Sequence, residues 1–129
     1  MSRLMLALVL LTAGCKKSPK PTLPEFPGAS QFRGGGNVEL PEATLFHQVW
    51  KSSDHAGQVT NFYAEEMAKR GAKRQGDAFV DDNVVHDGGF GGEGSATVKD
   101  PTRPGVYLAV YEDNNQTLID VWEAVPKAH

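Results

Sequence analysis

The stretch at residues 106–124, VYLAVYEDNNQTLIDVWEA, constrains the fold more than any other part of the chain. Apolar residues recur at every second position along both halves, which is the period of a β-strand. Asn114 and Asn115 lie between the halves, and Asn tolerates the positive φ angles of a two-residue hairpin turn. Both faces of this hairpin are apolar, so we expect it inside a sheet that is covered on both sides. The predicted cross-strand pairs are Val110–Ile119 and Leu108–Val121 on one face, and Tyr107–Trp122 and Tyr111–Leu118 on the other.

Residues 55–70 carry the pattern of an amphipathic helix. Asp54 is the expected N-cap, because its carboxylate can accept hydrogen bonds from the first free backbone amides. Glu65 and Lys69 are spaced as an i,i+4 ion pair, and Gly71 suits the left-handed residue that ends a helix. The apolar stripe that faces the core is expected to consist of Val59, Phe62, Tyr63 and Met67.

The remaining strands are shorter and are separated by turn residues. We expect strands at residues 43–51, 73–80 and 94–99, and a short strand at 28–32 before a flexible Gly-rich run at 33–36. One helix among several strands with short connections predicts an α+β fold. It consists of one antiparallel sheet of about four to six strands with a single helix packed on one face.

The amino-terminal end carries a targeting pattern. Its apolar run, residues 4–13, is about half of the roughly 20 residues that a membrane-spanning helix needs. A preceding Arg3 and small residues at the end of the run are typical of a secretory signal peptide. The segment Leu11-Thr12-Ala13-Gly14-Cys15 resembles the bacterial lipobox, although Thr12 stands where leucine is commonest. This resemblance implies cleavage after Gly14 and attachment of a diacylglycerol to Cys15, the only cysteine of the chain.

These features divide the chain into three parts. We expect a lipoprotein signal peptide at residues 1–14, a lipidated cysteine with a Pro- and Lys-rich tether at 15–27, and a single domain at 28–129. Four prolines in the tether favour an extended spacer of about 3.1 Å per residue. The residue after the cysteine is Lys16, not Asp, and resemblance to the enterobacterial sorting rule then implies the outer membrane, facing the periplasm.

A second resemblance covers roughly the first half of the mature domain. The chain has Pro27-Gly28-Ala29, then Ser52-x-Asp54, and a helix that ends at Gly71. This pattern resembles one that is common in small uncharacterised bacterial lipoproteins, whose members often have Trp where this chain has Ala72. The resemblance implies an α+β domain on a lipid anchor and supplies no activity. The matched residues within the helix are Val59, Phe62, Tyr63 and Met67.

Charge excludes one class of partner. Residues 21–129 hold nine Lys and Arg against sixteen Asp and Glu, a net charge of −7. Nucleic-acid binding requires a basic face, so we expect no nucleic acid as a partner. The expected partners are the membrane, through the lipid on Cys15, and an envelope protein that the sequence does not identify.

Two groups of residues are candidates for chemistry. Asp81, Asp82, His86 and Asp87 have the side chains that bind a divalent metal or act as acid and base, but their spacing matches no metal motif. We therefore interpret residues 81–89 as an acidic surface loop and expect no metal. The run GFGGEG at residues 89–94 matches G-x-G-x-x-G formally, but the residues after it predict a strand and not the helix of a dinucleotide site. No cofactor is expected.

The second candidate is the aromatic hairpin face that contains Tyr107, Tyr111 and Trp122. An exposed aromatic patch is typical of a binding site, but we expect other parts of the chain to cover this one. The candidates for cover are the amino-terminal strand, the Gly-rich loop and an aromatic residue of 43–51. The sequence thus predicts a non-enzymatic, lipid-anchored envelope protein that binds or scaffolds a partner. The alternatives are a carrier of a small ligand or glycan on the aromatic face, and a hydrolase or metal enzyme that uses residues 81–87.

Overall fold

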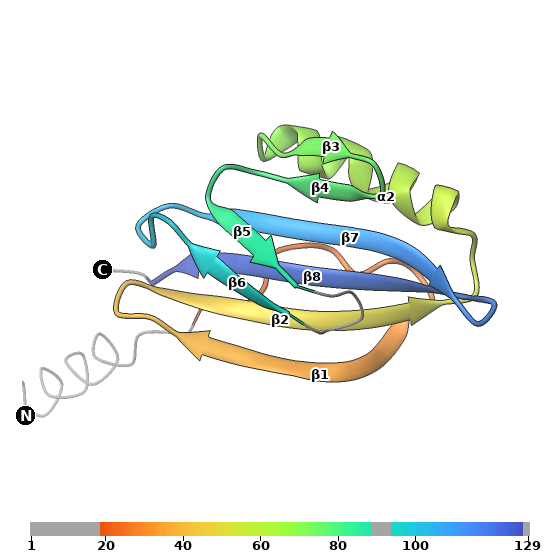
Figure 1. Cartoon of the computed structure of the whole chain (residues 1–129), viewed down its shortest axis with the longest axis horizontal. Coiled ribbons are helices and arrows are strands. Elements are labelled where there is room, and N and C mark those ends of the chain that lie inside the picture. Colours follow the sequence, from red (N-terminus) through yellow and green to blue (C-terminus); the bar gives the residue numbers. More distant parts are fainter. Residues whose placement is uncertain (1–18, 89–93, 128–129) are drawn as a thin grey trace, which may run out of the picture.

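The computed structural model describes residues 19–88 and 94–127. Six strands form the main antiparallel sheet in the order β1-β2-β8-β7-β4-β3, and two more form a small hairpin, β5–β6 (Figure 1). The predicted α+β class is confirmed. The elements are β1 Ser30–Glu39, β2 Ala43–Ser52, α2 Ala56–Lys69, β3 Lys73–Gln75, β4 Ala78–Val80, β5 Val84–Asp87, β6 Ser95–Val98, β7 Gly105–Asp113 and β8 Gln116–Pro126.

The predicted central hairpin is present with the expected register. All four predicted cross-strand pairs are found between β7 and β8. Asn114 and Asn115 have φ angles of 49° and 65°, as a two-residue turn requires. The hairpin lies in the middle of the sheet because β2 pairs with β8 and β4 pairs with β7.

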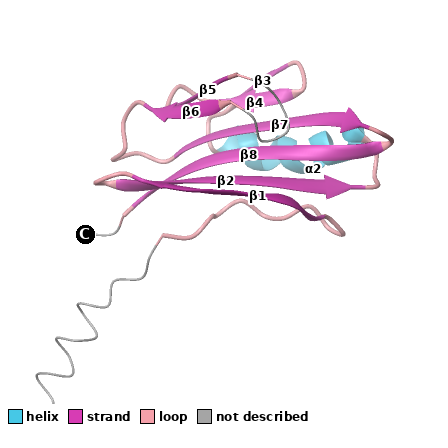
Figure 2. Cartoon of the chain, turned by 60° about the horizontal axis from the view of Figure 1, so that its bottom comes forward, coloured by secondary structure: helices cyan, strands magenta, loops and turns pink. Residues whose placement is uncertain are grey.

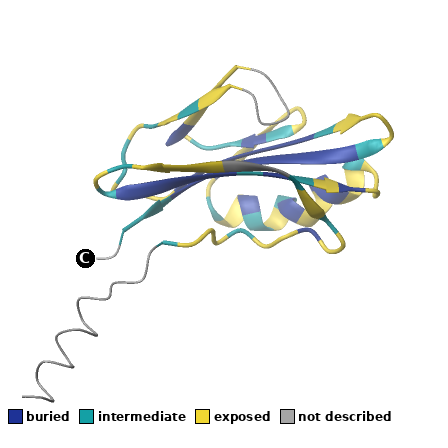
Figure 3. Cartoon of the chain, turned by 90° about the horizontal axis from the view of Figure 1, so that it is seen from below, coloured by how far each residue is buried: buried dark blue, intermediate teal, exposed yellow. Residues whose placement is uncertain are grey.

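Different elements cover the two faces of the sheet (Figure 2), and apolar side chains pack on both faces. Helix α2 packs on one face, and the β5–β6 hairpin lies on the opposite face (Figure 3). The helix side contains Phe26, Val59, Tyr63, Met67, Phe79, Leu108, Val110, Ile119 and Val121 among its buried residues, and the hairpin side contains Leu45, Val84, Tyr107, Ala109, Trp122 and Ala124.

The helix differs from the prediction at two positions. Its N-cap is His55, whose backbone N–H donates to the Gln58 side chain, and not Asp54. Asp54 stays outside the helix because its N–H donates to Ser52 Oγ and its carbonyl accepts from Thr117 Oγ. Phe62 is 37% exposed and lies beside the buried stripe, whereas the rest of the predicted stripe is buried. The predicted Glu65–Lys69 pair and the left-handed Gly71 are both found.

Three predictions about strands and loops were wrong. Strand β1 continues through the Gly-rich run that we expected to be a loop, with register shifts at Gln31/Arg33 and Gly34/Gly36 that accommodate the extra residues. Residues 73–80 form two short strands, β3 and β4, because Gly76 turns the chain with a φ of 61°. Residues 84–87 form strand β5, which pairs with β6, and are not part of a surface loop.

None of the helices among the described residues is long and apolar enough to cross a membrane.

Candidate functional site

The predicted aromatic face is closed by the protein itself. Tyr107 and Trp122 are only 8% and 6% exposed, and Tyr111 is half-buried. The His86 ring of β5 stacks on Tyr107 with ring centroids 4.5 Å apart, and the His47 ring of β2 stacks on Trp122 at 3.7 Å. The expectation of internal cover is therefore confirmed for Tyr107 and Trp122. The β5–β6 hairpin was not among the predicted covers, whereas His47 comes from the predicted 43–51 strand.

A buried histidine–carboxylate pair lies beside Trp122. His47 Nε2 is 2.7 Å from Asp120 Oδ1, and both residues are buried on neighbouring strands. Burial raises the pKa of Tyr107, and the nearby Asp120 carboxylate raises it further. A carboxylate can orient an imidazole as a base, but substrate access is also required, and this pair is enclosed. Sequence analysis missed the pair because 73 positions separate its members.

The predicted 81–87 cluster is dispersed into structural roles. Both oxygens of Asp81 accept backbone N–H groups, Oδ1 from Asn83 and Val84 and Oδ2 from Val106, which fastens β5 to β7. Asp82 is exposed and lies 3.6 Å from Arg103. His86 belongs to the aromatic layer, and Asp87 is exposed. Within the described ranges, no three His, Cys, Asp or Glu side chains gather in a way that could hold a metal ion.

A second set of hydrogen bonds, made by Asn83, holds the loop that precedes β7. Asn83 is fully buried and donates from Nδ2 to the carbonyls of Asp100, Arg103 and Pro104, while its Oδ1 accepts the Asp100 N–H. A Cβ at Gly105 would lie 2.8 Å from Val84, so this close approach requires glycine. The base of the β5–β6 hairpin is thus rigidly joined to the main sheet.

The part of the predicted tether nearest the domain is docked onto it. The Glu123 carboxylate is buried and accepts from the backbone N–H of Thr22 at 3.0 Å and from the Thr22 hydroxyl. Arg70, in turn, donates to Glu123 at 3.2 Å and to the carbonyl of Thr22 at 3.2 Å. We call these three residues, Thr22, Arg70 and Glu123, the tether clamp.

The residues after the clamp continue this docking. The Tyr63 hydroxyl of α2 donates to the Pro24 carbonyl at 2.8 Å, and burial raises the pKa of Tyr63 to about 12. Phe26 is 8% exposed within the helix-side core. Its ring meets the Phe62 ring edge-on, with the ring centroids 5.2 Å apart. Residues 22–26, which belong to the predicted tether at 15–27, therefore pack against the domain.

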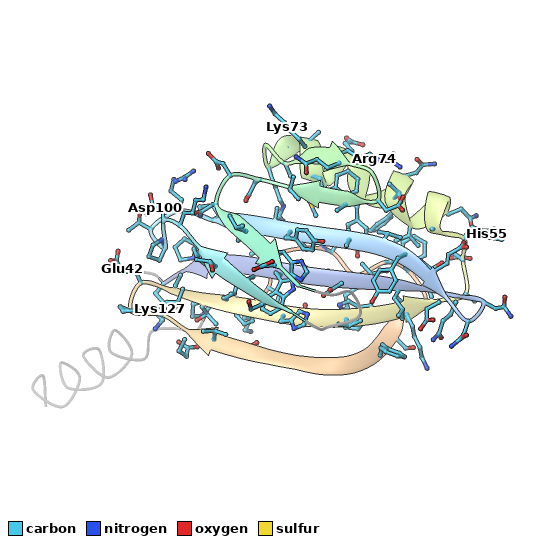
Figure 4. The ribbon with its side chains drawn as sticks, viewed as in Figure 1. Glu42, His55, Lys73, Arg74, Asp100 and Lys127 are labelled. Atoms are coloured by element: carbon cyan, nitrogen blue, oxygen red, sulfur yellow. The ribbon has the colours of Figure 1, made fainter. Side chains whose placement is uncertain are left out.

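An open pocket lies beside the clamp, at the end of the domain where β7 begins and β8 ends. Its volume is about 540 Å³, and we call it the end pocket. Asp100 and Lys127 mark this end in Figure 4, whereas His55 marks the opposite end. Its walls include Thr22, Arg70, Pro104, Val106, Val125 and Pro126.

Cys15, the predicted lipidation site, lies outside the described residues, as do residues 89–93 of the glycine motif. The residues that follow this motif form strand β6, as expected, and not a helix. Comparison with known proteins finds no match, whether to a family model, a curated protein or a solved structure.

Proposed function

We propose that this protein is a non-enzymatic, lipid-anchored module of the bacterial outer membrane that binds or scaffolds an envelope partner. The observation that carries the proposal is the tether clamp. With the chain docked from Thr22 onward, only residues 16–21 separate the lipid-bearing Cys15 from a rigid domain. At about 3.1 Å per residue, this spacer holds the domain roughly 20 Å from the lipid. The protein thereby presents its surface at a short distance from the membrane.

The cover of the aromatic face and the hydrogen bonds of Asp81 support scaffolding over the two alternatives. A carrier that uses the aromatic face needs Tyr107 and Trp122 to be accessible, and both are covered. An enzyme that uses residues 81–87 needs Asp81 to be free, and its carboxylate is occupied by three backbone N–H groups.

Fatty-acid labelling of bacterial cells tests the anchor. Wild-type protein should incorporate labelled fatty acid and fractionate with the outer membrane, and Cys15→Ala should do neither. A Cys15→Ala protein that is still labelled would contradict the lipid anchor. Lys16→Ala, which leaves the thiol in place, serves as the matched control for a substitution next to the lipidation site.

Cross-linking in intact envelopes tests the scaffolding role. The wild-type protein should recover a specific envelope protein that Cys15→Ala does not recover. A variant with ten Gly/Ser residues inserted between Pro21 and Thr22 keeps the lipid and the clamp but lengthens the reach. We expect it to recover less of the partner, and equal recovery by all three proteins would contradict a role that depends on position.

A further inference from the structure

The exposed surface that lines the end pocket is mainly apolar, although Lys69, Arg70 and Asp81 also line it. Pro104, Val106, Val125 and Pro126 supply its walls at the adjoining ends of β7 and β8. A pocket of about 540 Å³ is within the range of small-molecule sites, which are lined mainly by apolar groups. Its chemistry favours a ligand that is mostly hydrocarbon.

The charges around the pocket are already paired within the protein. Arg70 Nε lies 2.8 Å from Glu66 and Arg70 Nη1 lies 3.2 Å from Glu123. Both carboxylate oxygens of Asp81 accept backbone N–H groups. Lys69 is mainly exposed and reaches Glu65 at 3.8 Å. Because both cations already contact carboxylates of the protein and carboxylates outnumber cations here, an uncharged chain fits the pocket better than an anion.

The pocket lies close, along the chain, to the predicted lipidation site, which favours a lipid on Cys15 as its ligand. Thr22 lines the pocket, and Cys15 precedes Thr22 by seven positions. Seven extended residues span at most about 25 Å, so a chain attached to Cys15 reaches the pocket. Attachment through so short a linker gives an effective concentration in the millimolar range. A lipid that is free in solution has no such advantage.

We propose that the end pocket binds one acyl chain of the protein's own lipidated Cys15 when the protein is away from a bilayer. The inference rests on the proposed lipidation of Cys15. A methylene group takes up about as much room as a water molecule, roughly 30 Å³, so a sixteen-carbon chain needs about 480 Å³. The pocket is open on one side and shields the chain only in part, whereas a bilayer surrounds it. Contact with a membrane therefore releases the chain.

The single cysteine makes a direct test practical. The mature chain, residues 15–129, is alkylated at Cys15 with methyl, butyl, octyl or hexadecyl groups and studied below the concentration at which it aggregates. We expect the melting temperature to rise with chain length, by about 5 °C or more for hexadecyl over methyl. Backbone NMR shifts should change at Val106 and Val125. Melting that is independent of chain length, or shift changes confined to other surfaces, would overturn the proposal.

A pair of variants separates docking in the pocket from a general effect of the alkyl group. Val125→Phe reduces the volume of the pocket, and Val85→Phe adds the same ring on the exposed side of the β5–β6 hairpin. The hexadecyl effect should be lost in the first variant and kept in the second. If Val125→Phe does not fold, the chain-length series and the NMR shifts of the wild-type protein still decide the matter.

Addition of zwitterionic vesicles to hexadecyl protein should return the Val106 and Val125 shifts to those of the methyl derivative. Shifts that persist at saturating lipid would overturn the release step. Because the alkyl chain is attached chemically, failure of this test leaves the proposed anchor untouched. Failure of fatty-acid labelling in cells would instead remove the natural source of the chain and the inference with it.

Discussion

Replacement of Glu123 by alanine tests whether the tether clamp holds the docked segment. The Glu123 side chain is 4% exposed and accepts hydrogen bonds from Thr22, Leu23 and Arg70. Loss of one partner from a buried ion pair costs about 3–5 kcal/mol, because the remaining charge stays buried without compensation. Arg70 is partly exposed and keeps Glu66 as a second partner, which places the expected loss near the lower end, at about 3 kcal/mol.

The conservative change Glu123→Gln should cost less, about 1–2 kcal/mol. Its amide keeps one acceptor oxygen, but its NH₂ group faces the donors of Thr22 or Arg70. Urea unfolding of the mature chain, followed by tryptophan fluorescence, measures both changes. Glu65→Ala is the matched control, because this side chain is 85% exposed and should shift stability by less than about 0.5 kcal/mol.

Hydrogen exchange supplies the readout that is specific to the clamp. The Leu23 amide should exchange much faster in Glu123→Ala, while amides in the β7–β8 hairpin should follow only the global change in stability. A loss of less than about 1 kcal/mol, together with unchanged protection of Leu23, would refute the argument that Glu123 holds the docked segment on the domain.

Three further predictions concern packing, loop fastening and pH. Met67→Ala should lower the free energy of unfolding by about 2–5 kcal/mol and Phe62→Ala by only about 1 kcal/mol, because Met67 is fully buried and Phe62 is partly exposed. A larger drop in melting temperature for Phe62→Ala than for Met67→Ala would contradict the assigned stripe. Asn83→Ala should cost about 3 kcal/mol or more and speed hydrogen exchange at residues 100–104, and unchanged exchange there would contradict its fastening role. The pKa of Tyr63 is about 12 in the folded state against 10.0 normally, so the folded state holds the phenol proton more tightly. Ionisation of Tyr63 should therefore lower the free energy of unfolding by about 2 kcal/mol between pH 10 and 12, as urea midpoints would show, and Tyr63→Phe should remove this part of the fall.

The fold was predictable where one local pattern decided the outcome. The alternation at residues 106–124 and the positive φ tolerated by Asn114 and Asn115 were sufficient to predict the register of the central hairpin. The prediction failed where pairing overrode local composition. The Gly-rich part of β1 is extended because ten residues of β2 offer it a partner. Strand β5 was not predicted, because it contains His86 and Asp87 and lies among acidic residues.

The candidate sites were less predictable, because their members are far apart in sequence. Glu123 and Thr22 are 101 positions apart. Glu123 lies in strand β8, where the alternation of apolar residues shows only which face of the sheet the side chain occupies. The helix-side position of Glu123 follows from the hairpin register. A carboxylate on an otherwise apolar face was therefore the one available signal that it has a partner, although nothing in the pattern indicated the tether.

The placement of three hydrogen-bonded polar side chains, those of Asp81, Asn83 and Glu123, is itself an argument about function. Asp81 and Asn83 join the β5–β6 hairpin to the start of β7, and Glu123 joins the tether to the end of β8. Polar groups that are shielded from water need hydrogen-bond partners, and each of these side chains finds its partners within the chain. All three act at the end of the domain where the tether docks. These hydrogen bonds fix this end of the domain and make the junction between anchor and domain rigid. That rigidity supports our proposal of a module whose position at the membrane matters.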